Sequence, residues 1–247
     1  MLSMNIRLNR IGNWTSAKSL NYLGNVTHIL SINHVSSALH YRNETSDFYE
    51  SKTPFTISQT SLEQIARHFL KKNCVLESKN IDLKLDKISY LHQRNESPKL
   101  NKYEEKILQG IVIFYRDING IPVLGPGGYV IVSVVSDESI VSCRRLMRQV
   151  GERISEHKVL DTKHVIDQFE KRLISYGFDG LISVLDIKFC YFEAGKNDKQ
   201  EFFEPSYIIL FSMSTGEKNF FYKSIEVIPG IENPKQMWPL EKRFPVP

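Results

Sequence analysis

The sequence predicts an α+β fold of two helix-plus-antiparallel-meander units in tandem, with an irregular N-terminal arm. Two observations predict it. Two amphipathic helical patterns are each followed by a run of alternating or strongly apolar strand patterns. The turns between the strand patterns are polar and rich in Gly, Asn and Asp, which is typical of antiparallel hairpins. We expect each helix to lay its apolar stripe across one face of the sheet that follows it.

The chain divides into four segments by pattern. Residues 1–57 are polar and weakly patterned, and we expect an arm or a partial strand pair. Residues 58–150 form the first helix-plus-sheet unit and residues 151–229 the second. Residues 230–247 are a Pro-rich tail, expected to be extended, with Trp238 as its anchor.

Helical periodicity predicts helices at residues 61–72 and 162–175. The first pattern opens with a capping box, in which the side chains of Thr60 and Glu63 each accept a hydrogen bond from the other residue's backbone amide. Asp161 caps the second helix, and Gly177 can take the left-handed conformation that ends it. Both helices carry an apolar stripe at helical spacing, which must be buried against other elements.

The densest apolar stretch runs from Ile111 to Arg148 and predicts consecutive antiparallel strands. The turn Asp117–Gly120 contains Asn-Gly, the pair that favours a type I′ hairpin. The sequence GPGG at 125–128 resembles a phosphate-binding loop at first sight. Such loops lead from a strand into a helix N-terminus, whereas this one joins two strands, so we interpret it as a corner of the meander.

Composition excludes several classes of protein. The 247 residues are 41% hydrophobic and 24% charged, with a net charge of only +4, which argues for a globular core and against nucleic-acid binding. No apolar run approaches the roughly 18 residues of a membrane span. The N-terminus is not a secretory leader. The sequence therefore leaves the location open: cytoplasmic if Met1 is the true start, extracytoplasmic if a leader or anchor is missing.

Residues that carry chemistry do not form a recognisable catalytic motif. The three cysteines are widely spaced and lack a CxxC pair, so we interpret them as buried thiols. His28, His34 and His40 would share one face of a single strand, too far apart to hold one metal ion unless the segment folds back. We therefore predict no catalytic residue, no metal and no cofactor. The positions assigned to contact with a partner or an anion are Arg116, Gly125, Gly127, Gly128, Arg144 and Arg148.

The order of strands and turns resembles that of PepSY-type and cystatin-like domains. The resemblance rests on FYRDINGIPVLGPGGYVIVSV followed by SIVSCRRLMR, and on PSYIILFSM, a strand opened by Pro205. It covers about residues 58–228. Such domains occur in peptidase propeptides and in extracytoplasmic regulators of bacterial sensor kinases. The resemblance implies a regulator or inhibitor that acts through protein contact, and it implies no catalytic residues.

The sequence thus favours a non-catalytic binding or regulatory module whose partner is another protein. Exposed hairpins or a sheet edge would make the contact. Two alternatives from other classes stay open. One is a hydrolase whose site is assembled from distant residues, and the other is a structural subunit of a surface, spore or phage assembly.

Overall fold

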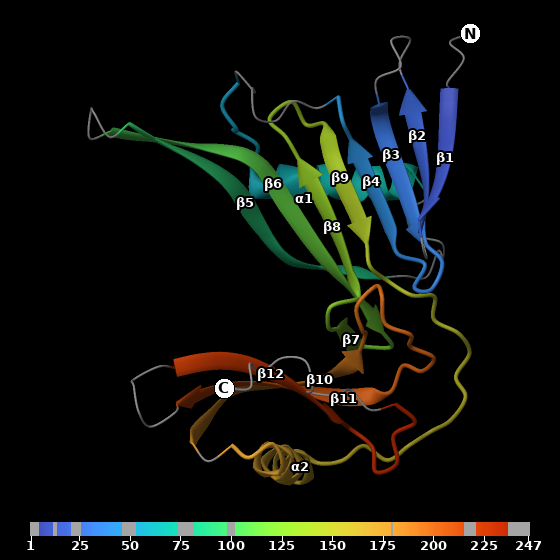
Figure 1. The fold of residues 1–247 in the computed structure, drawn as a ribbon, viewed down its shortest axis with the longest axis vertical. Helices are drawn as coiled ribbons and strands as arrows, with labels where there is room; N and C mark the ends of the chain where they lie inside the picture. The colour runs from blue at the N-terminus through green and yellow to red at the C-terminus, as the bar shows by residue number, and fades with distance from the viewer. Residues whose placement is uncertain are drawn as a thin grey trace. The chain divides into compact units, whose positions relative to one another are not determined.

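The structure is a computed structural model that describes residues 5–11, 14–20, 26–45, 53–73, 82–97, 102–178, 180–214 and 221–236 (Figure 1). These residues form twelve strands and two helices. The chain divides into two compact units. Unit 1 comprises Met1–Asp117, Pro126–Gln149 and Gly195–Lys199, and unit 2 comprises Ile118–Gly125, Val150–Ala194 and Gln200–Pro247.

Unit 1 is an antiparallel sheet with one helix, α1 (Gln59–Lys72), across one of its faces (Figure 1). Its described strands are paired in the order β1-β2-β3-β4-β9-β8-β6-β5. They are β1 (Asn5–Ile11), β2 (Trp14–Leu20), β3 (Val26–Asn33), β4 (Leu39–Asn43), β5 (Leu83–Ser97), β6 (Lys102–Ile118), β8 (Tyr129–Val134) and β9 (Ile140–Arg145).

The helix α1 docks through its apolar stripe. Leu62, Ala66 and Leu70 are buried and pack in one core with Val112 of β6 and Val132 of β8. Burial of this stripe is the main reason that a 14-residue helix is stable, since isolated helices of that length are marginal in water.

The N-terminus of α1 lies slightly before the predicted one. Ser58, and not Thr60, is the N-cap, and its hydroxyl accepts a hydrogen bond from the Ser61 amide at 3.1 Å. The predicted capping box is therefore wrong in its position. The sequence offers hydroxyl residues at 58, 60 and 61, and the helix uses the first of them as its cap.

Unit 2 is a smaller sheet of mixed direction with the second helix, α2 (Thr162–Ser175), on one face. Its described strands are paired in the order β7-β10-β11-β12, and β7 runs parallel to β10. They are β7 (Ile121–Leu124), β10 (Leu181–Phe192), β11 (Pro205–Ser214) and β12 (Phe221–Pro229).

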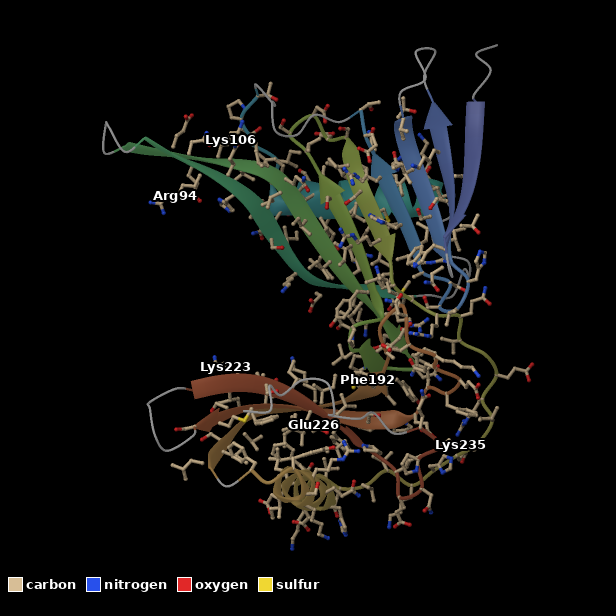
Figure 2. All side chains as sticks on the ribbon, in the orientation of Figure 1. Arg94, Lys106, Phe192, Lys223, Glu226 and Lys235 are labelled. Carbon is tan, nitrogen blue, oxygen red and sulfur yellow. The ribbon has the colours of Figure 1, made fainter. Side chains whose placement is uncertain are left out.

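An aromatic pair and an ion pair join α2 to its sheet. The rings of Phe169 and Phe211 meet edge to face with their centroids 4.9 Å apart. Arg172 of α2 forms an ion pair of 2.5 Å with Glu226 of β12, a carboxylate located in Figure 2. The glutamate is only 3% exposed, so this charge needs the arginine to offset its desolvation.

The predicted fold class, two helix-plus-meander α+β units with an N-terminal arm, is wrong. The described residues form twelve strands and only two helices, and the strand directions are mixed, since β7 and β10 are parallel. One physical reason is that β7, predicted as part of the first meander, pairs in parallel with β10 in unit 2. Local sequence pattern identifies a strand but does not identify its partner.

The predicted irregular arm is the second error, because residues 1–57 contribute four strands to the sheet of unit 1. Small polar residues hide the pattern: the hydroxyls of Ser16 on β2 and Ser31 on β3 bond to each other at 2.7 Å across the sheet. The innermost of the four strands, β4, is tied to the core, since Tyr41 packs against Phe69 of α1.

Several local predictions are confirmed. The helices predicted at 61–72 and 162–175 correspond to α1 and α2. Asn119 and Gly120 have φ values of 54° and 83°, as a type I′ turn requires. In the described part of the chain, neither helix is long and apolar enough to cross a membrane. Residues 237–247 of the tail, including Trp238, lie outside the described residues, as does Cys74.

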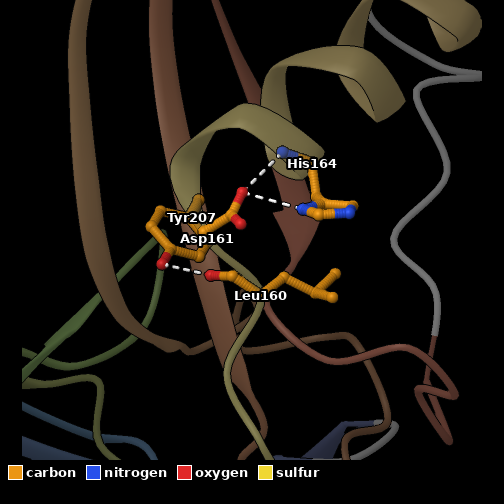
Figure 3. Close-up of polar contacts among 4 residues, drawn as sticks. All are labelled: Leu160, Asp161, His164 and Tyr207. Atoms are coloured by element: carbon orange, nitrogen blue, oxygen red, sulfur yellow. Dashed lines mark hydrogen bonds and ion pairs between the residues drawn. The ribbon is translucent and has the colours of Figure 1, made fainter.

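The start of α2 is fixed by two neighbouring groups, which Figure 3 shows. Asp161 is the predicted N-cap, and its carboxylate accepts hydrogen bonds from the backbone amide of His164 at 2.9 Å and from its Nδ1 at 2.8 Å. Tyr207 of β11 donates a hydrogen bond from its hydroxyl to the carbonyl of Leu160 at 2.8 Å. The cap and the tyrosine together attach the beginning of the helix to the sheet.

The cap at Asp161 predicts a pH-dependent contribution to stability. The hydrogen bonds from the His164 amide and then from its ring hold the pKa of Asp161 below its ordinary value. A depressed pKa means that the contribution is fully present above the unfolded-state pKa of about 3.9 and is lost as pH falls through the folded-state pKa. We expect Asp161→Ala to lower the melting temperature of the transition that unfolds unit 2 by a few degrees near neutral pH, and much less in strong acid.

Thermal melts of Asp161→Ala and Asp161→Asn across this pH range test the prediction. Asparagine also caps helices but carries no charge, so its melting temperature should stay closer to that of the wild type near neutrality. If the difference between Asp161→Ala and the wild type were the same in strong acid, the ionised cap would not be its cause.

Candidate functional site: a basic cluster on the sheet of unit 1

Two of the predicted contact residues, Arg116 and Arg148, lie inside unit 1. Arg116 is 2% exposed and Arg148 is 7% exposed. Nη1 of Arg116 donates to the carbonyl of Arg148 at 2.6 Å. Nη2 of Arg148 donates to the carbonyls of Gly195 and Asp198 at 2.7 and 2.5 Å. The guanidinium of Arg148 thus holds the backbone of the Gly195–Lys199 loop in place, and that of Arg116 holds the backbone at Arg148. Both have a positioning role.

The three glycines predicted as contact residues have roles in backbone conformation and packing. Gly127 and Gly128 are buried in unit 1, and the Gly128 amide donates to the carbonyl of Leu146 at 2.8 Å. Gly125 belongs to unit 2 and has a φ of 126°. A Cβ at that position would lie 2.3 Å from the carbonyl oxygen of Glu193. The GPGG sequence is therefore tightly packed, but it is not the corner of a meander that the sequence predicts, because β7 pairs with β10 and not with β8.

Arg144, the remaining predicted contact residue, is exposed on β9. It lies opposite His40 of β4 on one side and Ile131 of β8 on the other. The next residues on these strands, Tyr41 and Cys143, pack in the core beneath α1. Since successive side chains on a strand point to opposite faces, Arg144 and His40 lie on the face away from α1.

Two further cations join them. Arg42 follows His40 by two residues on β4 and so shares its face. Lys196 lies on the loop that Arg148 holds, with its ammonium 5.3 Å from the centre of the Trp14 ring, a distance typical of a cation–π contact. We call His40, Arg42, Arg144 and Lys196 the basic cluster.

The positive charge of the basic cluster affects the pKa of its histidine, His40. Partial burial lowers the pKa of His40, and the positive charges of Arg144, Lys196 and Arg42 lower it further. The imidazole is therefore neutral at neutral pH, while the three neighbours stay charged. Arg42 has a carboxylate partner, Glu44, at 2.9 Å. The charged groups that act on His40 are all cations, so this part of the sheet has a positive potential that suits an anion.

Thiol chemistry finds no support at the two described cysteines. Burial raises the pKa of both Cys143 and Cys190 to about 12. A thiol with such a pKa is almost entirely protonated at neutral pH, and the thiolate is the nucleophilic form. Among the described residues, no group of three or more His, Cys, Asp or Glu side chains is placed to hold a metal ion.

The histidines expected on one strand face are separated by the fold. His28 lies on β3 and stacks on Tyr41, with ring centroids 6.0 Å apart, and Tyr41 belongs to the α1 side of the sheet. His34 lies in the following turn and bonds to Thr15 at 2.7 Å. His40 is on β4, facing the other way. The even spacing of the three residues misled because the chain reverses between β3 and β4.

Arg144 is the one member of the basic cluster that the sequence pattern indicates as a contact residue. Arg42 and Lys196 have no local signal, since isolated cations in polar segments are ordinary surface residues. Their convergence depends on the pairing of β4 with β9 and on the position of the Gly195–Lys199 loop in unit 1. Both are long-range features of the chain.

Comparison with known proteins informs the fold alone. No protein family profile matches the chain, and no curated protein matches it. A solved structure of an uncharacterized protein from Eubacterium rectale ATCC 33656 is similar, with a TM-score of 0.55 and 12% sequence identity. The match covers 92% of this chain and 74% of that chain. The resemblance to PepSY-type and cystatin-like domains is neither supported nor contradicted by these comparisons.

Proposed function

We propose that the protein is a non-catalytic binding module that recognises an acidic segment of a protein partner through the basic cluster. The observation that carries the proposal is the convergence of Arg42, Arg144 and Lys196 around His40 on the face of the unit 1 sheet away from α1. A regulatory or inhibitory role, of the kind that the PepSY-type resemblance implies, belongs to the same proposal.

The surroundings of the cluster favour a carboxylate-bearing peptide. Directly opposite residues on neighbouring strands have Cβ atoms about 5 Å apart, so His40 and Arg144 can address the same carboxylate. Beside them on β8, the side chain of Ile131 is half-buried and offers apolar contact to the rest of a peptide. Trp14, beneath Lys196, provides an aromatic surface near the same place.

Unit 2 also favours a protein as the partner. Its sheet carries large apolar side chains that are well exposed within the described structure, with Leu181 81%, Leu185 48% and Ile225 44% exposed. Ile225 is directly opposite the half-buried Leu210 on β11. Exposed apolar side chains that lie next to one another on a sheet, as this pair does, favour contact with a protein.

Charge reversal at Arg144 tests the proposal. We expect Arg144→Glu to weaken binding of a fluorescent peptide of alternating Glu and Ser by at least about tenfold at an ionic strength of about 0.1 M, because it replaces an attraction by a repulsion. Fluorescence anisotropy measures the dissociation constant. Wild-type binding should also weaken with added salt, as expected for exposed charges.

A matched control is available on the same sheet face. Lys87 of β5 lies in the same cross-strand row as Arg144, separated from it by Ile131 and Ile113, and it is exposed. Lys87→Glu has the same change in net charge and should keep the affinity within about twofold, since three strand spacings of about 4.8 Å exceed the Debye length. Equal losses in both variants, or no peptide binding by the wild type, would refute the proposed function.

A further inference from the structure

The position of His40 suggests a proton-dependent site. His40 is the one titratable member of the basic cluster whose ordinary pKa lies near neutrality. It is half-buried and lies in the middle of the cluster. Arg144 is directly opposite it on β9, Arg42 is two residues along its own strand, and Lys196 approaches from the Gly195–Lys199 loop.

Among the residues that the structure describes, the remaining neighbours of His40 do not supply a compensating charge. Its partner on β3 is Ser31, whose hydroxyl bonds to that of Ser16 at 2.7 Å. The next side chain in its row beyond Arg144 is Ile131 of β8. The nearby carboxylate of Glu44 pairs with Arg42 at 2.9 Å. Imidazolium at this place would therefore face three cations from three directions.

A bound carboxylate changes that balance. It places negative charge beside the ring and accepts a hydrogen bond from either ring nitrogen, both of which are donors in the imidazolium. The same carboxylate offsets the charges of Arg144 and Lys196, which in the free protein oppose protonation of His40. An opposite charge within about 4–6 Å favours the charged form of a titratable group.

We propose that His40 takes up a proton when an acidic peptide binds the basic cluster, so that binding strengthens as pH falls through the neutral range. This inference rests on the proposed function and adds its regulation. Ligand and proton then bind cooperatively, and each raises the affinity for the other by the same factor. The protein would release its partner on alkalinisation and hold it on mild acidification.

The test is a pH series with the same Glu/Ser peptide. The peptide carboxylates, with a pKa of about 4.3, keep their charge between about pH 6 and pH 8, so a change in affinity reports on the protein. We expect wild-type affinity to rise roughly fivefold from pH 8 to pH 6. His40→Gln keeps a polar side chain without the titration, so it should bind the peptide with an affinity that is independent of pH.

Calorimetry and a second histidine variant complete the design. Titrations near neutrality in two buffers of different ionisation enthalpy should show fractional proton uptake by the wild type and none by His40→Gln. His68 is exposed on α1, on the other side of the sheet, and His68→Gln should behave as the wild type. If His40→Gln fails to fold, the NMR titration of the His40 ring in the wild type, with and without peptide, gives the same answer through a raised pKa in the complex.

The outcomes separate the inference from the proposed function. Wild-type binding without pH dependence, or pH dependence retained in His40→Gln, would overturn the proton linkage and leave the binding function intact. Absence of peptide binding at every pH would overturn both. A pH-dependent affinity lost only in His40→Gln, with proton uptake by the wild type, would support the inference.

Discussion

Replacement of Phe169 by alanine should destabilise unit 2 by about 3–5 kcal/mol, the cost typical of removing a buried aromatic side chain. Phe169 is 1% exposed and is the residue of α2 whose ring meets Phe211 of β11 edge to face. The substitution removes that aromatic contact and leaves a cavity in the middle of the core between the helix and the sheet. Val165 and Leu173, one turn before and after, would lose packing against the same space.

Local measurements are needed because two compact units can unfold separately, in which case a single unfolding transition does not describe the chain. Native-state hydrogen exchange gives the opening free energy of individual amides. We expect the amides of β11 to lose most of their protection in Phe169→Ala. Ile174→Ala provides the control on the same helix, since Ile174 is 72% exposed and its truncation should be nearly silent. Similar losses in both variants would contradict this description of the core.

The burial of Phe169 against the sheet could be predicted from the sequence. Its helix has an apolar stripe with polar residues on the other faces, an N-cap at Asp161 and a glycine at 177 with a φ of 74°. Each of these signals is local and acts over a few residues. The same holds for α1 and for the strands from β6 to β12, whose residue patterns indicate them without knowledge of their neighbours.

The errors concern long-range pairing. The residues of β2 and β3 that face one another include Ser16 and Ser31, and such small polar residues give strands no apolar face that alternation could reveal. For β7, the short sequence IPVL indicates a strand correctly, but its parallel neighbour β10 follows far along the chain. Nothing in either segment specifies that pairing.

The candidate site shows the same difference between local signals, which the sequence carries, and long-range pairing, which it does not. Arg144 stands in a cluster of cations along the sequence, and this made it a candidate. The neighbouring Arg148 carried an equal signal, yet β9 ends at Arg145 and Arg148 lies buried against the Gly195–Lys199 loop. Burial of an arginine is rare enough that sequence reasoning places it on the surface by default. The link between the two is structural, since Arg148 holds the loop that carries Lys196 to the basic cluster.

Substitution of Gly125 by alanine should be the most damaging single change in the GPGG sequence, with a loss of roughly 2–5 kcal/mol from backbone strain and steric overlap together. Its φ of 126° is disfavoured for any L-residue with a Cβ. The new methyl group would lie 2.3 Å from the Glu193 carbonyl oxygen and 2.8 Å from the ring of Phe192. Glu193 cannot readily withdraw, because its amide donates to the Leu124 carbonyl at 2.7 Å.

Gly120→Ala separates backbone strain from steric overlap as causes of the destabilisation. Gly120 also has a positive φ, 83°, but a Cβ there would meet nothing within 4 Å, so this variant measures strain without overlap, at about 1 kcal/mol. The opening free energy of amides in β10, measured by hydrogen exchange, should fall much further in Gly125→Ala than in Gly120→Ala. If Gly125 instead allowed a ligand to approach the backbone closely, Gly125→Ala would weaken binding of the acidic peptide and leave the hydrogen-exchange protection of the β10 amides unchanged. Because the overlap involves the backbone that pairs β7 with β10, we expect the loss of protection to begin at Glu193 and to spread along β10.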